Sequence, residues 1–225
     1  MARIRRLKSF NYTRHVSDWG PLITETSGDL RRLDHVIRFS SIPIVYQEST
    51  SQHSYWVSLY AALIHQEMGG KDDLIGPILL HAIGHDLREC VAGDVVRTLK
   101  YETHELKAEV DRAESLLSER LLGERAKKFL LLMDSIAANP YIKAIVKAAD
   151  FLSLYQYMRR EALRGNIEIM PFYFRMCKDL NAMAKNTEEH EFPSTFYSSI
   201  RKEALHIART CFRGLQTDHK LMRNI

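Results

Sequence analysis

The segment Leu79–Asp94 brings together residue types that bind metals and move protons. His85 and Asp86 are adjacent, and Glu89 follows four positions after His85. Residues four apart on a helix share a face, so Glu89 would lie beside the pair. A carboxylate there is placed to orient or deprotonate a water molecule next to a bound metal. A His-Asp pair also occurs by chance on a surface, so this interpretation depends on further ligands elsewhere in the chain.

Two residues in other segments supply such ligands. His53 stands one helical turn before the apolar Val57, which directs its ring inward; the alternative is a core histidine bonded to a backbone carbonyl. Asp150 lies in the apolar run KAIVKAADFLSLY, where an unpaired charge is costly. Its alternative role is a salt bridge to Lys147, one turn away.

His53, His85, Asp86 and Asp150 together form a mixed nitrogen and oxygen set. Such a set suits a divalent ion such as Mn, Co, Fe, Ni, Zn or Mg, with room for water. A bound ion of this kind would acidify water and neutralise phosphate charge. Each residue alone has an ordinary structural explanation, but the four taken together favour a metal site.

The composition indicates one globular chain in a reducing compartment. The 225 residues, 45% of them hydrophobic, suffice for a sizeable core. Three widely spaced cysteines indicate neither a disulfide framework nor a zinc site, which favours the cytoplasm. No apolar run is long enough to span a membrane, and no apolar segment follows the basic N-terminus. The net charge of +4 suits an anionic substrate; a nucleic-acid partner is less favoured, since no nucleic-acid module is recognisable.

Apolar residues recur at helical spacing, which predicts an all-α fold. We expect an N-terminal arm at 1–27, a core at 28–185 and a helical extension packed on it at 186–225. The predicted helices cover residues 28–40, 51–68, 72–91, 98–122, 124–137, 141–164, 170–185 and 195–217.

The ordered motifs also resemble a known family. His53, then His85-Asp86-Leu87-Arg88-Glu89, then Gly93-Asp94, Lys100-Tyr101 and Asp150 follow the pattern of the HD-domain phosphohydrolase superfamily. Within it, residues 28–180 look most like the YfbR-like 5′-deoxynucleotidases. The resemblance implies a helical HD domain whose metal ligands are His53, His85, Asp86 and Asp150. It also implies a small (deoxy)nucleotide substrate, and self-association as a dimer or larger oligomer.

The resemblance further assigns roles around the metal. It implies that Glu89 acts on the attacking water or the leaving oxygen, and that Arg38 orients the substrate phosphate through its two-pronged donor. Phe39 takes the place of an aromatic residue that packs against the nucleoside. The residues implied on the sugar side, which favour deoxyribose, are Asp94, Val95, Val96 and Arg97.

One departure from the family pattern leaves two reactions open. Val96 and Arg97 stand where the family usually carries proline and threonine. Arg97 is either solvated or available to hold a longer phosphate tail. The chain is therefore predicted to release phosphate from deoxynucleoside monophosphates or tripolyphosphate from the triphosphates. A nucleotide sensor without catalysis is the alternative of another class.

Overall fold

The computed structural model describes residues 30–95, 100, 103–185 and 192–212. In these residues the regular elements are helices, joined by one isolated β-bridge between Ile37 and Ser49, and the predicted all-α class is confirmed. The elements in chain order are η1 (Leu30–His35), α2 (Thr50–Glu67), η2 (Asp72–Leu74), α3 (Ile75–Gly84), α4 (Glu89–Ala92), α6 (His104–Leu121), α7 (Glu124–Ala137), α8 (Pro140–Leu163), α9 (Met170–Lys185) and α10 (Ser194–Cys211).

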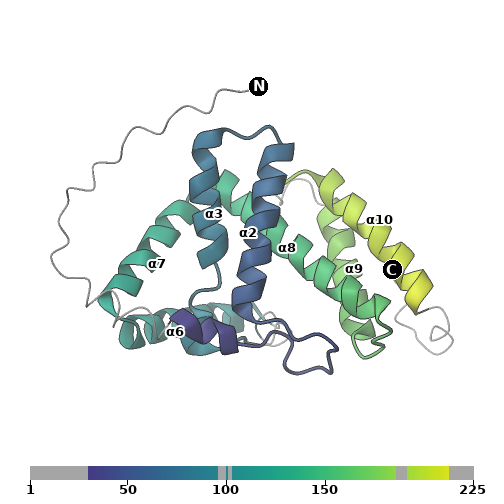
Figure 1. Cartoon of the computed structure of the whole chain (residues 1–225), viewed down its shortest axis with the longest axis horizontal. Coiled ribbons are helices and arrows are strands. Elements are labelled where there is room, and N and C mark those ends of the chain that lie inside the picture. Colours follow the sequence, from purple (N-terminus) through teal and green to yellow (C-terminus); the bar gives the residue numbers. More distant parts are fainter. Residues whose placement is uncertain (1–29, 96–99, 101–102, 186–191, 213–225) are drawn as a thin grey trace.

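Helix α8 is the central element of the larger hydrophobic core. It packs against α2 and α3 and also against α9 and α10 (Figure 1). It begins at a defined point, because the Asn139 side chain accepts hydrogen bonds from two backbone N–H groups and Pro140 occupies the first helical turn. Ile145 and Ala149 are completely buried. The middle of α8 therefore lies at the centre of the molecule, where it can present side chains to α2 and α3.

A second, smaller core holds the segment that contains His85 and Asp86. Its buried members come from η1, α4, α7 and the residues that flank them. Leu87 and Cys90 are the contributions of the metal-site segment itself. This cluster packs the segment against η1 and α7. Its members are Leu33, Leu87, Cys90, Leu122, Ala126 and Leu130.

The segment that contains His85 and Asp86 differs from the predicted helix. The single helix expected at 72–91 is divided into η2, α3 and α4, and His85–Arg88 form a turn. The N–H of Leu87 donates to the carbonyl of Gly84, and the N–H of Glu89 donates to that of Asp86, so i to i+3 bonds replace the α-helical pattern. Gly84 also packs directly against α7: a Cβ added there would lie 2.9 Å from the Met133 sulfur.

Other boundaries also differ from the prediction. The helix expected at 28–40 is the six-residue 3₁₀-helix η1, because the chain beyond it pairs with the start of α2. Helix α6 begins at His104, where the Thr103 side chain caps the N–H of Leu106. Helix α10 ends at Cys211. The predicted arm at 1–27 and the ends of the predicted extension lie outside the described residues.

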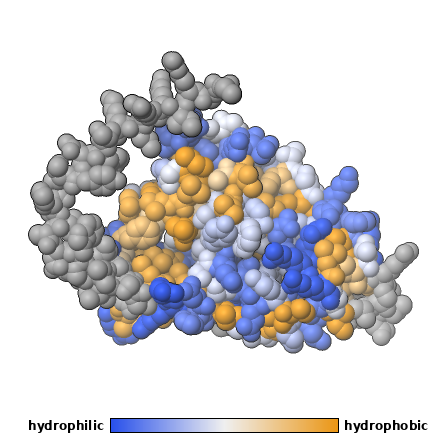
Figure 2. All heavy atoms as spheres, viewed as in Figure 1, coloured by the Kyte–Doolittle hydropathy of each residue, from blue (hydrophilic) through white to orange (hydrophobic). Residues whose placement is uncertain are grey.

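The described surface carries apolar side chains over several helices. Figure 2 shows apolar surface on the face that carries α3 and α7. Leu63 on α2, Ile83 on α3 and Leu131 on α7 are 57%, 51% and 68% exposed. Of the helices described, none is by itself both long and apolar enough to cross a membrane; α7 and α8 satisfy the length and composition only as a pair, bent by 102°.

Candidate metal centre

The first turn of α2 positions His53. Ser49 caps the helix by accepting from the N–H of Gln52, whose side chain accepts from the N–H of Ser49 in return. This reciprocal pair is a capping box, and it fixes where the helix starts. His53 follows it directly and is completely buried on the side that faces α8. The predicted inward direction of His53 agrees with this burial.

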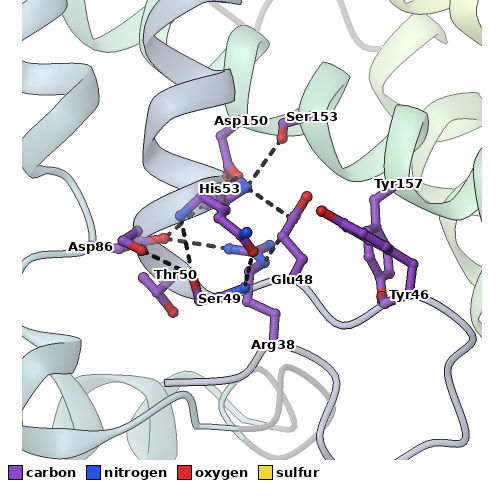
Figure 3. Close-up of polar contacts among 12 residues, drawn as sticks. Arg38, Tyr46, Glu48, Ser49, Thr50, His53, Asp86, Asp150, Ser153 and Tyr157 are labelled. Carbon is purple, nitrogen blue, oxygen red and sulfur yellow. Dashed lines mark hydrogen bonds and ion pairs between the residues drawn. The ribbon is translucent and has the colours of Figure 1, made fainter. Parts of the chain in front are cut away.

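Four side chains from three segments lie close together, and Figure 3 shows three of them, His53, Asp86 and Asp150. Ligand atoms of His53, His85 and Asp86 all lie within 4.8 Å of one another. The Nε2 atom of His53 lies 3.1 Å from Asp150 Oδ1 and 3.6 Å from Asp86 Oδ2. His85 Nε2 lies 3.2 Å from the same Asp86 oxygen. The structure therefore brings together all four residues that were predicted as ligands.

Two buried ring nitrogen atoms without hydrogen bonds in the described part of the chain indicate that this cluster suits a metal ion. The Nε2 atoms of His53 and His85 are both buried and have no hydrogen-bond partner among the described residues. Buried polar atoms without partners are rare in folded proteins, so each needs an explanation. Two imidazole nitrogens and two carboxylates around one point are a donor set that a divalent ion would satisfy. The residues present thus fit a metal.

The opposite ring nitrogens keep the two imidazoles in place. Nδ1 of His85 lies 2.7 Å from the carbonyl oxygen of Ala82, which can only accept, so Nδ1 carries a proton and Nε2 is the ring atom that a metal would bind. Nδ1 of His53 lies 3.1 Å from Ser153 Oγ on α8. Such partners orient metal-binding histidines and are part of most metal sites.

The pKa values of the two histidines in the cluster are shifted in opposite directions. Burial and the positive charge of Arg38 lower the pKa of His53 to about 4. Burial would also lower the pKa of His85, but the Asp86 and Asp150 carboxylates outweigh it and raise the value to about 9. Burial opposes ionisation of Asp150, yet its contact with His53 brings the pKa down to about 2. The pKa of Asp86 is lowered as well, because His85 overcomes the effect of burial.

Arg38 reaches the cluster from the chain segment before α2. The N–H of Arg38 donates to the Glu48 carbonyl and the N–H of Thr50 donates to the Val36 carbonyl, which pins residues 36–38 against the start of α2. The guanidinium of Arg38 lies 3.5 Å from Asp86 and 3.8 Å from the buried Glu48. Burial would lower the pKa of Arg38, but the surrounding carboxylates, Asp86 first, raise it. A cation is thus fixed beside the metal ligands.

Glu89 lies at the start of α4, on the same side of the turn as the cluster. The hydroxyl of Thr50 donates to its Oε2 at 2.9 Å. Burial and the negative charges of Asp86 and Asp94 raise the pKa of Glu89 to about 8. Asp94 stands just after Gly93, whose φ of 76° turns the chain back, and burial raises the pKa of Asp94 too. Two carboxyl groups with raised pKa values therefore flank the metal ligands.

Phe39 adopts a backbone conformation that few side-chain-bearing residues share. Its φ is 56°, in the left-handed region, which costs energy for any residue except glycine. The guanidinium of Arg38 lies 3.5 Å from Asp86 and 5.5 Å from the centre of the Phe39 ring, and that ring stacks on Tyr157 at 4.9 Å. A cavity opens beside Phe39, and Arg38 and Asp94 line it as well. Arg38 therefore borders both the metal ligands and this cavity.

A second, acidic cleft adjoins the cluster on the side of α6 and α7. His85, Asp86 and Glu89 form part of its wall. Its two cations are already paired: Arg88 lies 2.7 Å from Asp134, and Lys100 lies 2.8 Å from Glu114. Asp111 adds a further carboxylate near Lys100, at 3.3 Å. Carboxylates outnumber the basic side chains in this cleft.

Comparisons with known proteins agree with this arrangement. The family profile described as "5'-deoxynucleotidase YfbR-like" matches residues 27–200. The chain belongs to this YfbR-like family of HD-domain phosphohydrolases. A 5′-deoxynucleotidase of Shewanella oneidensis is 32% identical over 147 residues, which cover 62% of this chain and 75% of the relative. One of Citrobacter koseri is 29% identical over 179 residues, or 76% and 89%.

Solved structures support the fold of this YfbR-like chain. An HD-domain phosphohydrolase of Listeria innocua aligns with a TM-score of 0.63 at 20% identity, covering 88% of this chain and 96% of the other. The HD phosphohydrolase of cyanophage S-2L, bound to dA and one catalytic Zn²⁺, aligns with a TM-score of 0.52 at 16% identity, covering 83% and 96%. At such identities the similarity shows the shared helical fold.

The remaining predicted site residues of this YfbR-like chain are less fully described. Val95 is half-buried next to Asp94. Val96 and Arg97 lie outside the described residues. The alternative salt bridge between Asp150 and Lys147 is not observed among the described residues, and Lys147 is exposed. Asp150 instead faces His53.

Sequence reasoning missed four residues that support the site. Ser153 stands one turn after Asp150, a spacing that could have identified it, and Thr50 precedes the predicted helix start by one residue. Glu48 is buried beside Arg38, but nothing in the pattern before α2 marks it. Tyr157 lies in the hydrophobic core, and it also donates its hydroxyl to the Tyr46 carbonyl.

Proposed function

We propose that the protein is a metal-dependent 5′-nucleotidase that releases phosphate from deoxynucleoside 5′-monophosphates. The observation that carries the proposal is the convergence of the buried Nε2 atoms of His53 and His85 with the carboxylates of Asp86 and Asp150. Family membership and the names of the relatives, 5′-deoxynucleotidase, support the same substrate class.

His53, His85, Asp86 and Asp150 would hold the metal. When bound, a divalent ion supplies Lewis acidity: it polarises phosphoryl oxygens and makes water more acidic. Mn, Co, Fe, Ni and Zn all accept such mixed ligands, and Zn²⁺ in the cyanophage relative supports including it in the assays.

Other side chains of the protein bind the phosphate, transfer a proton and contact the sugar. Arg38 presents a fixed cation to the phosphate and stabilises negative charge that develops there. The Glu89 carboxyl, held by Thr50, takes or gives the proton needed by the attacking water or the 5′-oxygen. Asp94, which lines the cavity, accepts from the sugar hydroxyl.

The acidic cleft supports a monophosphate rather than a triphosphate substrate. With the nucleoside in the cavity beside Phe39, a longer phosphate tail would extend past the cluster toward Arg88 and Lys100. Both cations are neutralised by Asp134 and Glu114. The surplus carboxylates would repel a tail that carries further negative charges.

A nucleotide panel tests the reaction. Full-length protein is incubated with each dNMP and dNTP in the presence of Mn²⁺, Co²⁺ or Zn²⁺, and orthophosphate and tripolyphosphate are measured separately. We expect orthophosphate from the monophosphates, lost on adding EDTA. Tripolyphosphate from dNTPs would favour the triphosphohydrolase reaction instead. Nucleotide binding without any metal-dependent turnover would favour the sensor.

We also propose that the protein self-associates through the apolar surface of α2, α3 and α7. Leu63, Ile83 and Leu131 are more than half exposed there. Exposed apolar patches of this kind are typical of protein interfaces. Light scattering should give a mass of at least two chains for the wild type and of one chain for Leu131→Asp. A wild-type protein that stays a single chain at high concentration would contradict this.

A further inference from the structure

One face of α9 lines the cavity that opens beside Phe39. The four residues that it contributes recur at helical spacing: Phe172, Arg175, Met176 and Asp179. The other apolar walls come from the 38–42 segment and from α8, through Phe39, Ile42, Leu154 and Met158. The cavity is therefore an apolar slot with charged side chains at a few defined points.

The two charged residues that α9 contributes to this cavity have side chains without a partner among the described residues. Among the residues described, the side chains of the exposed Arg175 and the half-buried Asp179 make no hydrogen bond or ion pair. They stand four apart, so their Cβ atoms are about 6 Å from each other on one helix face, yet they do not pair with each other. An unpaired donor and an unpaired acceptor therefore border a largely apolar cavity.

Arg38 connects this cavity to the metal ligands. Its guanidinium lies 3.5 Å from Asp86, and Arg38 lines the cavity together with Asp94. A 5′-nucleotide with its phosphate at the metal cluster would extend its sugar past Asp94 and its base between Phe39 and α9. Helix α9 supplies no metal ligand. Its Arg175 and Asp179 line the cavity that the base would enter.

The chemistry of this pair matches one base better than the others. Arginine donates two parallel bonds to the O6 and N7 acceptors of guanine. A carboxylate accepts from two adjacent N–H groups, and guanine alone offers these, at N1 and N2. Adenine has one amino group, and thymine and cytosine have no N7 acceptor. Guanine can therefore form two hydrogen bonds with each of the two side chains.

We propose that Arg175 and Asp179 select guanine, so that the preferred substrate is a deoxyguanosine 5′-phosphate. This inference deepens the proposed function and rests on it for the reaction, but not for base binding. Asp179 accepts from the N1–H and N2–H groups, and Arg175 donates to O6 and N7. Phe39, backed by Tyr157 at 4.9 Å, packs against the base.

Binding of nucleosides to the metal-loaded full-length chain tests base recognition without hydrolysis. Equilibrium dialysis compares deoxyguanosine with deoxyadenosine, with deoxyinosine, which lacks the N2 amino group, and with 7-deazadeoxyguanosine, which lacks N7. We expect deoxyguanosine to bind about tenfold more tightly than each of the other three.

Two variants assign the contacts to their side chains. Asp179→Asn should abolish the preference for deoxyguanosine over deoxyinosine while the preference over 7-deazadeoxyguanosine persists. Arg175→Met should do the reverse. Lys178→Met and Glu168→Gln are matched controls, because each removes an exposed charge outside the cavity lining. Both controls should retain the wild-type preferences.

The outcomes separate this inference from the proposed reaction. Equal or undetectable binding of all four nucleosides, or preferences that survive both variants, would overturn guanine selection even if phosphate is released from every dNMP. A guanine preference that responds to both variants would support it even if no phosphate is released, in which case the proposed hydrolysis fails alone.

Discussion

Replacing one buried carboxylate should loosen the segment that carries Arg38 and Phe39. Glu161, near the end of α8, is completely buried. Its Oε2 accepts from the N–H of Val45 at 2.8 Å and from the Asn166 side chain at 2.6 Å. Its Oε1 accepts from the N–H of Tyr46 at 2.9 Å. These bonds tie the chain after Phe39 to the rigid central helix.

The cost of Glu161→Gln follows from this geometry. An amide whose oxygen replaces Oε2 keeps the bonds from Val45 and Asn166, but its NH₂ group then faces the N–H of Tyr46. One charge-assisted hydrogen bond is lost, the two that remain become neutral, and the 4.0 Å ion pair with Arg164 disappears, which together cost about 2 to 3 kcal/mol. We expect the free energy of unfolding to fall by about 2 to 3 kcal/mol.

Urea denaturation measures this loss directly. With a typical m-value, the midpoint should fall by about 1 M without a change in m. kcat/KM for a dNMP should fall, because Glu161 holds the segment that carries Arg38 and Phe39 without touching the metal ligands. Glu203→Gln is the control, since Glu203 lies 4.0 Å from Arg159 at the surface and contributes little. An unchanged midpoint for Glu161→Gln would refute the reasoning.

Three further substitutions probe the metal centre. Ser153→Ala removes the partner of His53 and should weaken metal binding about tenfold or more in a chelator competition, whereas the exposed Ser199→Ala should not. Glu89→Gln should lower kcat by about 10² to 10⁴ while the metal content stays at the wild-type level; unchanged turnover would exclude a proton-transfer role. Asp150→Asn should reduce the metal bound after dialysis and Lys147→Met should not, and equal loss in both would restore the salt-bridge interpretation.

The sequence predicted the parts of the site that leave a burial signal. A histidine on the apolar face of one helix and an aspartate inside an apolar run are both unusual enough to stand out, so His53 and Asp150 were found. Their convergence with His85 and Asp86 could be expected from the family pattern. The all-α class followed from the periodicity of apolar residues, which depends only on local spacing.

The features of the fold and the site that the sequence did not predict depend on contacts between distant segments. The break after Gly84 arises where α3 meets Met133 of α7, and no local rule places that contact. Thr50 meets Glu89 across 39 positions, and Glu161 meets Tyr46 across 115. The positive φ of Phe39 is likewise imposed by its surroundings, because phenylalanine has no local preference for it.

The amount of metal bound per chain tests the central claim most directly. Wild-type protein and Asp86→Ala are dialysed against Mn²⁺ or Co²⁺, separated from free ion and analysed for metal, with circular dichroism confirming that both are folded. We expect the folded wild type to retain close to one ion per chain and the folded variant to retain far less. Equal metal content in the two folded proteins, or none in the wild type, would contradict a metal held by His53, His85, Asp86 and Asp150.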